Sequence, residues 1–176
     1  SGQQSTKNGT TVPGWRDFER SVALVFGGEA KENKYIFDVL IPERGQKVYY
    51  GVSCKMRRTL NDTKRTGRVT LELSNSSGTF WDKLLAIGIH QQNYKDMPLQ
   101  VAQALVNQEN EWHQSASCDK GGDIDLSKSF YLALSWNPQG EYQLFKFSLV
   151  LSNPADLNWD FPIVKKTEKI GRRLRG

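Results

Sequence analysis

The chain has 176 residues, of which 38% are hydrophobic and 24% charged, as expected for one globular domain. Its formal net charge of +5 favours an acidic partner such as nucleic acid. No apolar run approaches the roughly 18 residues of a membrane span, and two cysteines are too few for a disulfide scaffold. We therefore expect a cytoplasmic protein with free thiols and no membrane segment.

The first half of the chain predicts an arm, a helix and a hairpin. Residues 1–12 are polar and predict a flexible N-terminal arm, and residues 13–176 predict a single domain that ends in a basic tail. The stretch "WRDFERSVALVF" (15–26) has apolar residues at helical spacing and is followed by two glycines, which predicts a helix with a stop signal. Residues 34–58 then predict two apolar strands with Arg44-Gly45 at their turn.

The second half predicts two more helices and a second hairpin. "VTLELS" (69–74) fits a strand or a short helix equally well. Residues 79–89 and 98–114 have helical apolar spacing, with Pro98 suited to a first helical turn. Residues 129–151 predict two strands around the turn Asn137-Pro138-Gln139-Gly140. Together these elements predict an α/β or α+β fold.

Polar residues inside the first predicted hairpin point to a site. Asp38 lies in its first strand, and Ser53 and Lys55 lie on one face of its second strand. Burying a lone charge costs several kcal/mol unless another group compensates it, so we expect these side chains to converge. Phosphodiester hydrolysis uses a divalent cation held by carboxylates, with a nearby lysine to orient water and offset negative charge. Asp38 and Lys55 supply two of these groups, and Ser53 stands where a second carboxylate is expected.

This unit resembles the core of the PD-(D/E)xK nucleases, whose best-known members are the type II restriction endonucleases. A helix bearing Glu19, a strand bearing Asp38 and a following strand bearing Ser53-Cys54-Lys55 carry the resemblance, which covers roughly residues 13–90. "FD" replaces the family's "PD", and Ser53 replaces its acidic residue. The resemblance implies a restriction-endonuclease-like core with a mixed central β-sheet flanked by helices. It further implies a Mg²⁺-dependent, sequence-specific endonuclease for double-stranded DNA, in which Mn²⁺ can substitute. Palindromic sites would be cut by a homodimer or higher homo-oligomer.

The resemblance also implies roles for individual residues. Asp38 and Lys55 would be catalytic, and Asp38 and the backbone carbonyl of Cys54 would bind the metal. Some restriction enzymes with Ser-x-Lys recruit the missing carboxylate from a downstream helix, and Glu72, 17 residues past Lys55, is the candidate if "VTLELS" is helical. Glu19 resembles the glutamate that many members place on the first helix beside the metal, so both glutamates remain candidates for the position left by Ser53.

Two blocks of basic residues suggest interactions with DNA phosphates. The candidates lie in residues 55–68 and near the C-terminus, and they are Arg57, Arg58, Lys64, Arg65, Arg68, Arg172 and Arg173. A solvated basic face is the simpler interpretation of either block alone.

Two other functions remain open. A non-catalytic DNA-binding module on a nuclease-like fold would explain Ser53 as a lost carboxylate, since fold alone does not establish catalysis. An RNA-binding protein that uses exposed aromatic residues is less favoured because no RNA-recognition motif is present. The distance of Glu72 or Glu19 from Asp38 distinguishes the enzyme from the binding module.

Overall fold

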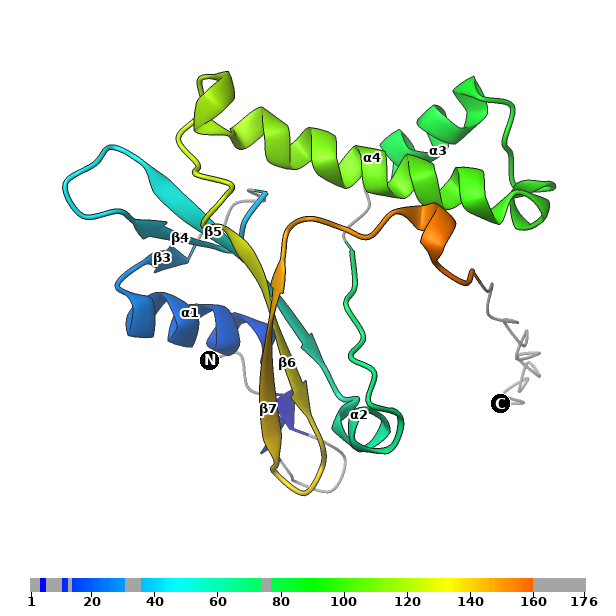
Figure 1. Cartoon of the computed structure of the whole chain (residues 1–176). Coiled ribbons are helices and arrows are strands. Elements are labelled where there is room, and N and C mark those ends of the chain that lie inside the picture. Colours follow the sequence, from blue (N-terminus) through cyan, green and yellow to red (C-terminus); the bar gives the residue numbers. More distant parts are fainter. Residues whose placement is uncertain (1–3, 6–10, 13, 31–35, 74–76, 160–176) are drawn as a thin grey trace, which may run out of the picture.

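The computed structural model describes residues 4–5, 11–12, 14–30, 36–73 and 77–159 of the chain. Within these residues it is a mixed α and β structure (Figure 1). The strands are β1 (Gln4–Ser5), β2 (Thr11–Val12), β3 (Glu29–Ala30), β4 (Val39–Pro42), β5 (Tyr49–Arg57), β6 (Phe130–Trp136) and β7 (Tyr142–Ser148). The α-helices are α1 (Trp15–Phe26), α2 (Leu60–Thr66), α3 (Ser77–Ala86) and α4 (Pro98–Ala116). Short 3₁₀ turns lie at Tyr94–Asp96, Cys118–Lys120 and Pro154–Asp156.

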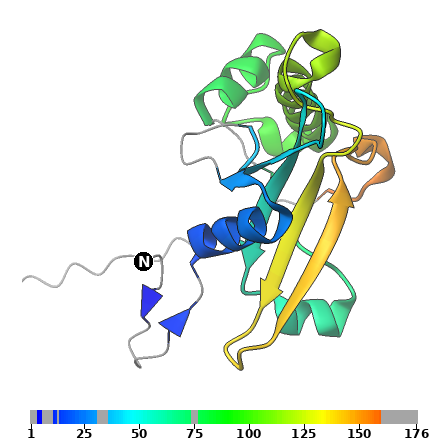
Figure 2. The same cartoon turned by 90° about the vertical axis from the view of Figure 1, so that its left-hand side faces the viewer.

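The central sheet has five strands in the order β3-β4-β5-β6-β7. All neighbours are antiparallel except β5 and β6, which are parallel, so the predicted mixed sheet is confirmed. Both predicted hairpins form, and their turns use Gly45 and Gly140 at φ 77° and 82°, where a side chain would be strained. A parallel pair requires a long crossover, and the chain between β5 and β6 supplies it through α2, α3 and α4 (Figures 1 and 2).

Helix α1 covers one face of the sheet. Its residues Val22 and Ala23 pack with alternate residues of the strands, among them Val39, Val52 and Cys54. The helix ends where the Gly27 N–H bonds the Ala23 carbonyl, as the two glycines predicted. Three apolar residues of the predicted helical stripe remain largely exposed: Trp15, Val25 and Phe26.

Helix α4 lies toward the opposite face. Ala116 packs there with Leu40, Tyr131 and Ile124, and the Ala116 carbonyl accepts a hydrogen bond from the Ile124 N–H. Ile124 in turn bridges to Tyr49 at the start of β5. Helix α3 packs against the N-terminal half of α4 through a separate cluster that includes Phe80 and Leu84. The two sides of the sheet are therefore covered by helices from different parts of the described chain.

Two predictions for the middle of the chain need correction. The basic stretch contains α2, which was not predicted because its sequence "LNDTKRT" has no apolar stripe. "VTLELS" was expected to be a strand or a short helix, yet residues 68–73 form neither. Leu71 and Leu73 pack against the core while Glu72 between them is exposed, so the segment is held by alternate side chains. In the described part of the chain, no helix has the length and apolarity needed to cross a bilayer.

Candidate functional site

The site begins where β4 stops pairing with β5. The ladder runs as far as Val39 opposite Val52, and the Asp38 N–H still bonds the Val52 carbonyl at 3.1 Å. Two residues further along β5, the Asp38 carboxylate takes the place of a backbone carbonyl from the neighbouring strand. Its Oδ2 accepts the Cys54 N–H at 2.7 Å. Asp38 was predicted to lie inside the strand, but it lies in the bend just before β4, where its carboxylate satisfies a backbone donor of β5.

The Cys54 carbonyl points to the same edge of β5, along the stretch that lies beyond the end of β4. The N–H and C=O of one strand residue point to the same side of the strand, and the Cys54 N–H points to Asp38. The thiol is buried with the α1 cluster, where burial and the nearby Asp38 and Glu19 carboxylates raise its pKa. A thiol kept protonated in this way is a poor nucleophile and a poor metal ligand, so the backbone carbonyl is the oxygen donor that Cys54 offers at this edge.

Glu19 reaches this edge from α1. Its side chain is half-buried, and burial raises the pKa of its carboxyl from 4.5 to about 7, with the Asp38 carboxylate as the next cause. Asp38 is affected similarly, since burial raises its pKa against the opposing effects of Lys55 and the Cys54 hydrogen bond. Glu19 and Asp38 are therefore two carboxylates close enough for the charge on Asp38 to disfavour that on Glu19.

Ser53 and Lys55 complete the group around Asp38. Ser53 is buried, and its side chain hydrogen-bonds the Asp38 carboxylate, which lowers the Asp38 pKa. The Lys55 ammonium acts in the same direction on both Asp38 and Glu19. The structure thus brings together four of the side chains singled out in the sequence: Glu19, Asp38, Ser53 and Lys55.

Glu72 lies elsewhere. It is on the irregular segment 68–73, its side chain is 62% exposed, and it forms an ion pair with Arg57. Recruitment of Glu72 required "VTLELS" to be helical, and residues 69–73 of this segment are not helical. Glu19 is the carboxylate that the structure places beside Asp38.

A buried acidic residue was missed by the sequence reasoning. Glu109 on α4 is 5% exposed, and burial raises the pKa of its carboxyl to about 7 against an opposing effect of Lys55. His113, one turn later, is also 5% exposed, and burial lowers its pKa to about 4. The helical spacing of the sequence did indicate burial of both residues, because they fall on the helix face that buries Ala102, Val106 and Ala116.

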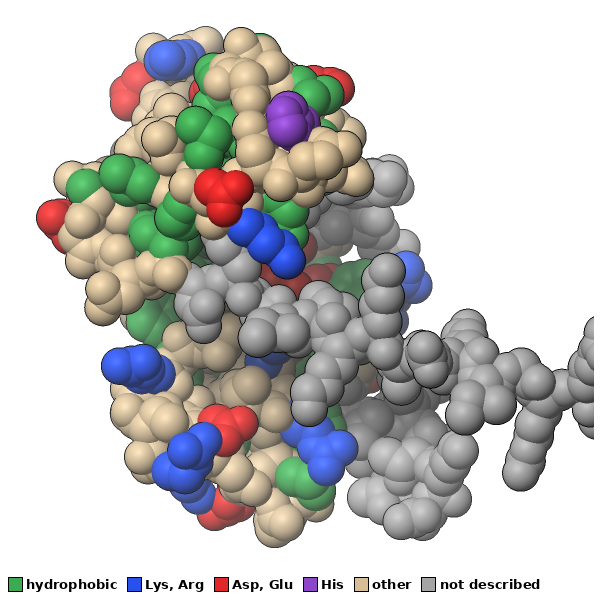
Figure 3. Space-filling model, turned by 90° about the vertical axis from the view of Figure 1, so that its right-hand side faces the viewer, with side chains coloured by type: hydrophobic (Ala, Val, Ile, Leu, Met, Phe, Trp, Pro, Cys, Tyr) green, Lys and Arg blue, Asp and Glu red, His purple; other side chains and the backbone are tan. Residues whose placement is uncertain are grey.

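The first basic block surrounds α2. The Thr59 and Ser135 hydroxyls are hydrogen-bonded at 2.8 Å, which places α2 at the carboxyl ends of β5 and β6. Figure 3 shows Lys and Arg side chains interleaved with acidic ones at the level of α2. The observed pairs are Arg57 with Glu72, Lys64 with Glu141, Arg65 with Asp62, and Arg58 over the Trp136 ring. The three ion pairs among these contacts are exposed and individually weak, so a phosphate can compete with their acidic partners. Arg68 is exposed, and Arg172 and Arg173 lie outside the described residues.

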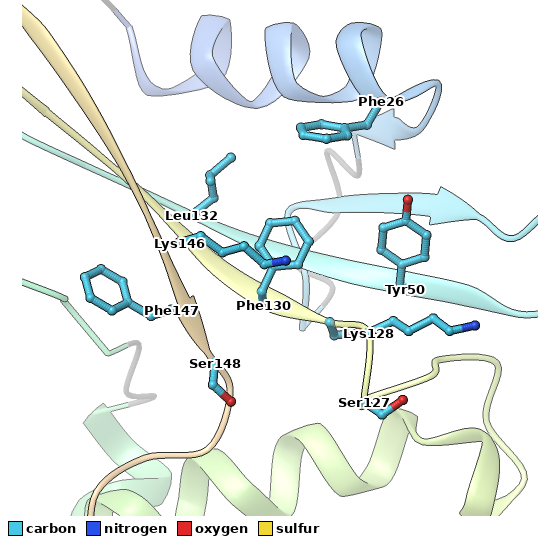
Figure 4. Close-up of a pocket in the computed structure, with 10 residues that line it drawn as sticks. Phe26, Tyr50, Ser127, Lys128, Phe130, Leu132, Lys146, Phe147 and Ser148 are labelled. Carbon is cyan, nitrogen blue, oxygen red and sulfur yellow. The ribbon is translucent and has the colours of Figure 1, made fainter.

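A hollow of about 820 Å³ lies apart from these groups, between the end of α1 and strands β6 and β7 (Figure 4). Phe26, Tyr50 and Phe130 line it, and the Lys146 ammonium lies over the Phe130 ring at 4.3 Å. Its lining contains none of the side chains that meet around Asp38, and it does not include Glu109. The catalytic candidates and this hollow are therefore separate features.

Comparison of the chain with models of known protein families, with curated proteins and with solved structures finds no match. Across the described residues, no three acidic, histidine or cysteine side chains converge closely enough to hold a metal ion. Two neighbouring carboxylates with raised pKa values, beside a backbone carbonyl, are nonetheless the oxygen donors that Mg²⁺ prefers. These donors fit a hard cation that keeps several water ligands.

Proposed function

We propose that the protein is a Mg²⁺-dependent endonuclease that hydrolyses phosphodiester bonds in double-stranded DNA at specific sequences. The observation that carries the proposal is the meeting of Asp38, Glu19 and Lys55 at one open sheet edge. This arrangement supports the resemblance to the PD-(D/E)xK core, in which the same residue types lie on a first helix and two adjacent strands. The basic surface around α2 lies at the end of β5, the strand that carries Lys55.

Each group has a distinct task in this reaction. Asp38, the Cys54 carbonyl and Glu19 would hold the cation, with water completing its coordination. The bound cation supplies Lewis acidity and a lowered pKa for the attacking water. Lys55 orients that water and offsets the charge that develops on the scissile phosphate. Basic residues near α2 hold the DNA backbone, which fixes its position without reading sequence.

A second candidate is a DNA-binding module without catalysis. It is favoured by Ser53 in place of an acidic residue and by the lack of a three-ligand cluster among the described residues. Both candidates predict salt-dependent DNA binding. They differ only in whether the groups around Asp38 and Lys55 hydrolyse the bound DNA.

The deciding experiment is cleavage of supercoiled plasmid with Mg²⁺ or Mn²⁺, followed by sequencing of the ends. We expect nicked and linear products with ends at a defined sequence, and their complete loss in Lys55→Met. Lys47→Met is the matched control, because Lys47 is an exposed lysine in the turn before β5. A wild-type protein that binds DNA but never cuts it would establish the binding module. A protein that does neither would refute both candidates.

The proposal includes a homodimer, because a palindromic site has two-fold symmetry. Sedimentation analysis with and without a short palindromic duplex that contains the cleavage sequence tests this. Two chains per duplex are expected, and one chain per duplex would refute the dimer.

A further inference from the structure

The buried Glu109 requires an explanation that the proposed metal site does not supply. It lies on α4, at a position that an apolar residue would ordinarily occupy. Burial of a carboxylate is strongly unfavourable unless a charged or hydrogen-bonding group faces it. In the described part of the chain, neither its Oε1 atom nor the nearby Tyr131 hydroxyl has a well-formed hydrogen bond, and Tyr131 lowers the Glu109 pKa less than Lys55 does. Glu109 therefore requires a positively charged group that faces it.

His113 fixes the position of α4 over the sheet. Its ring stacks on Phe37 with centroids 5.5 Å apart, and Phe37 directly precedes Asp38. The same ring meets Tyr131 edge-on at 5.9 Å, and Tyr131 is the partner of Ser53 in the β5–β6 ladder. His113 therefore lies over the level of Ser53. Phe37 itself is fixed by Gly51, where a Cβ atom would lie 2.2 Å from the Phe37 ring.

The direction of α4 then carries Glu109 away from the level of Ser53 and toward that of Lys55. The end of α4 is tied through Ile124 to Tyr49, so the helix runs back toward the start of β5. One turn earlier than His113 is four residues, or about 6 Å along the helix. The step from Ser53 to Lys55 is two strand residues, or about 6.6 Å, on the same face. The electrostatic effect of Lys55 on Glu109 agrees with this placement.

From this geometry we infer that Glu109 is a positioning residue, which holds the Lys55 ammonium from the α4 side of the sheet. The inference rests on the proposed function, since it assigns Glu109 a task in the same reaction. Lys55 then has acidic groups on two sides: Asp38 and Glu19 at the open edge, and Glu109 above the sheet. A flexible four-carbon side chain held this way would present its ammonium in one place, which a single acidic partner does not ensure.

The first test measures the pairing itself and does not depend on cleavage. Thermal unfolding of wild type, Glu109→Gln, Lys55→Met and the double variant forms a double-mutant cycle. We expect the change in Tm of the double variant to differ from the sum of the single changes by roughly 2 °C or more. Additive changes would overturn the inference. If Lys55→Met does not fold, Lys55→Gln takes its place in the cycle.

The second test measures the consequence for the reaction. Under single-turnover conditions we expect Glu109→Gln to cut DNA about 10–100-fold more slowly, the range for partners that orient a catalytic group. Its DNA affinity should stay within about twofold of wild type, since Glu109 is buried away from phosphates, and Glu109→Asp should recover part of the rate. The control is Glu111→Gln, two residues away on α4, where Glu111 is exposed and paired with Lys83.

The two tests separate failure of this inference from failure of the proposed function. If the wild type cuts DNA and Glu109→Gln cuts equally fast, Glu109 does not position Lys55. If the wild type never cuts, the nuclease proposal fails, and the unfolding cycle alone decides whether Glu109 and Lys55 are paired.

Discussion

Replacing Glu19 with Gln should reduce the pH dependence of divalent-cation binding. The pKa of Glu19 is raised from 4.5 to about 7 by burial and by the Asp38 carboxylate. With that pKa, the ionised fraction of Glu19 is about 0.9 at pH 8 and about 0.1 at pH 6. A cation binds the ionised form and releases the proton. Wild-type affinity for Mg²⁺ should therefore fall about tenfold between pH 8 and pH 6 through Glu19 alone.

Isothermal titration of the DNA-free protein with Mg²⁺ or Ca²⁺ at pH 6, 7 and 8 measures this effect. Glu19→Gln should bind more weakly at pH 8 and should not show the roughly tenfold change in affinity across the range. Asp17→Asn, on the same helix, is the control and should behave as wild type. Equal slopes for wild type and Glu19→Gln would refute the assignment of Glu19 to the cation site.

The same pKa shift affects folding without a cation. Because the folded state keeps a proton that the unfolded state releases, Glu19 reduces stability as pH rises from 4.5 to about 7. His113 acts in the opposite direction, since its lowered pKa adds stability as pH rises from about 4 to 6.5. The difference in Tm between wild type and Glu19→Gln cancels the His113 contribution, and it should move in favour of Glu19→Gln as pH increases.

Three further predictions concern Asp38, the basic surface and Glu72. Asp38→Asn and Asp38→Ala should both abolish plasmid cleavage, but only Asp38→Ala leaves the Cys54 N–H unpaired, at a cost of about 1–3 kcal/mol in a denaturant titration; equal stability of the two variants would contradict the observed hydrogen bond. Replacing Lys64 or Arg68 with Gln should weaken DNA binding and reduce its salt dependence by roughly one unit of slope for each phosphate that the residue neutralises. Unchanged slopes in filter-binding assays would leave only a solvated basic face. Glu72→Ala should keep near wild-type single-turnover rates, since Glu72 is exposed and paired away from the site, whereas near-complete loss of activity would restore it as the recruited carboxylate.

Local patterns in the sequence were sufficient for the strand that carries Lys55 and for the strand that directly follows Asp38. The helical spacing before Gly27, the turn at Gly45 and the turn at Gly140 each encode their structure within a few residues, and α1 and both hairpins form as predicted. Side-chain alternation placed Ser53 and Lys55 on one face of β5, and the cost of burying lone charges predicted that Asp38 would meet them.

Interactions between distant parts of the chain could not be predicted in the same way. The parallel pairing of β5 with β6 joins residues separated by three helices, and no local pattern specifies it. Glu109 comes to lie near Lys55 only because His113 positions α4 over Tyr131, a packing that sequence spacing does not encode. Glu72 shows the converse. Its place downstream of Lys55 made it the candidate for a recruited carboxylate, but Leu71 and Leu73 pack against the core and leave Glu72 exposed.

The hydrogen bond from Cys54 to Asp38 has a consequence for assembly. An open strand edge attracts strands from other copies of a protein, and proteins limit this with charged groups directed at the edge. The Asp38 carboxylate occupies the backbone donor that an added strand would need first. The carboxylate therefore discourages a strand of another copy from pairing with β5 beyond the end of β4. If the proposed homodimer forms, this carboxylate favours pairing through another surface, which leaves the Asp38 side of β5 accessible.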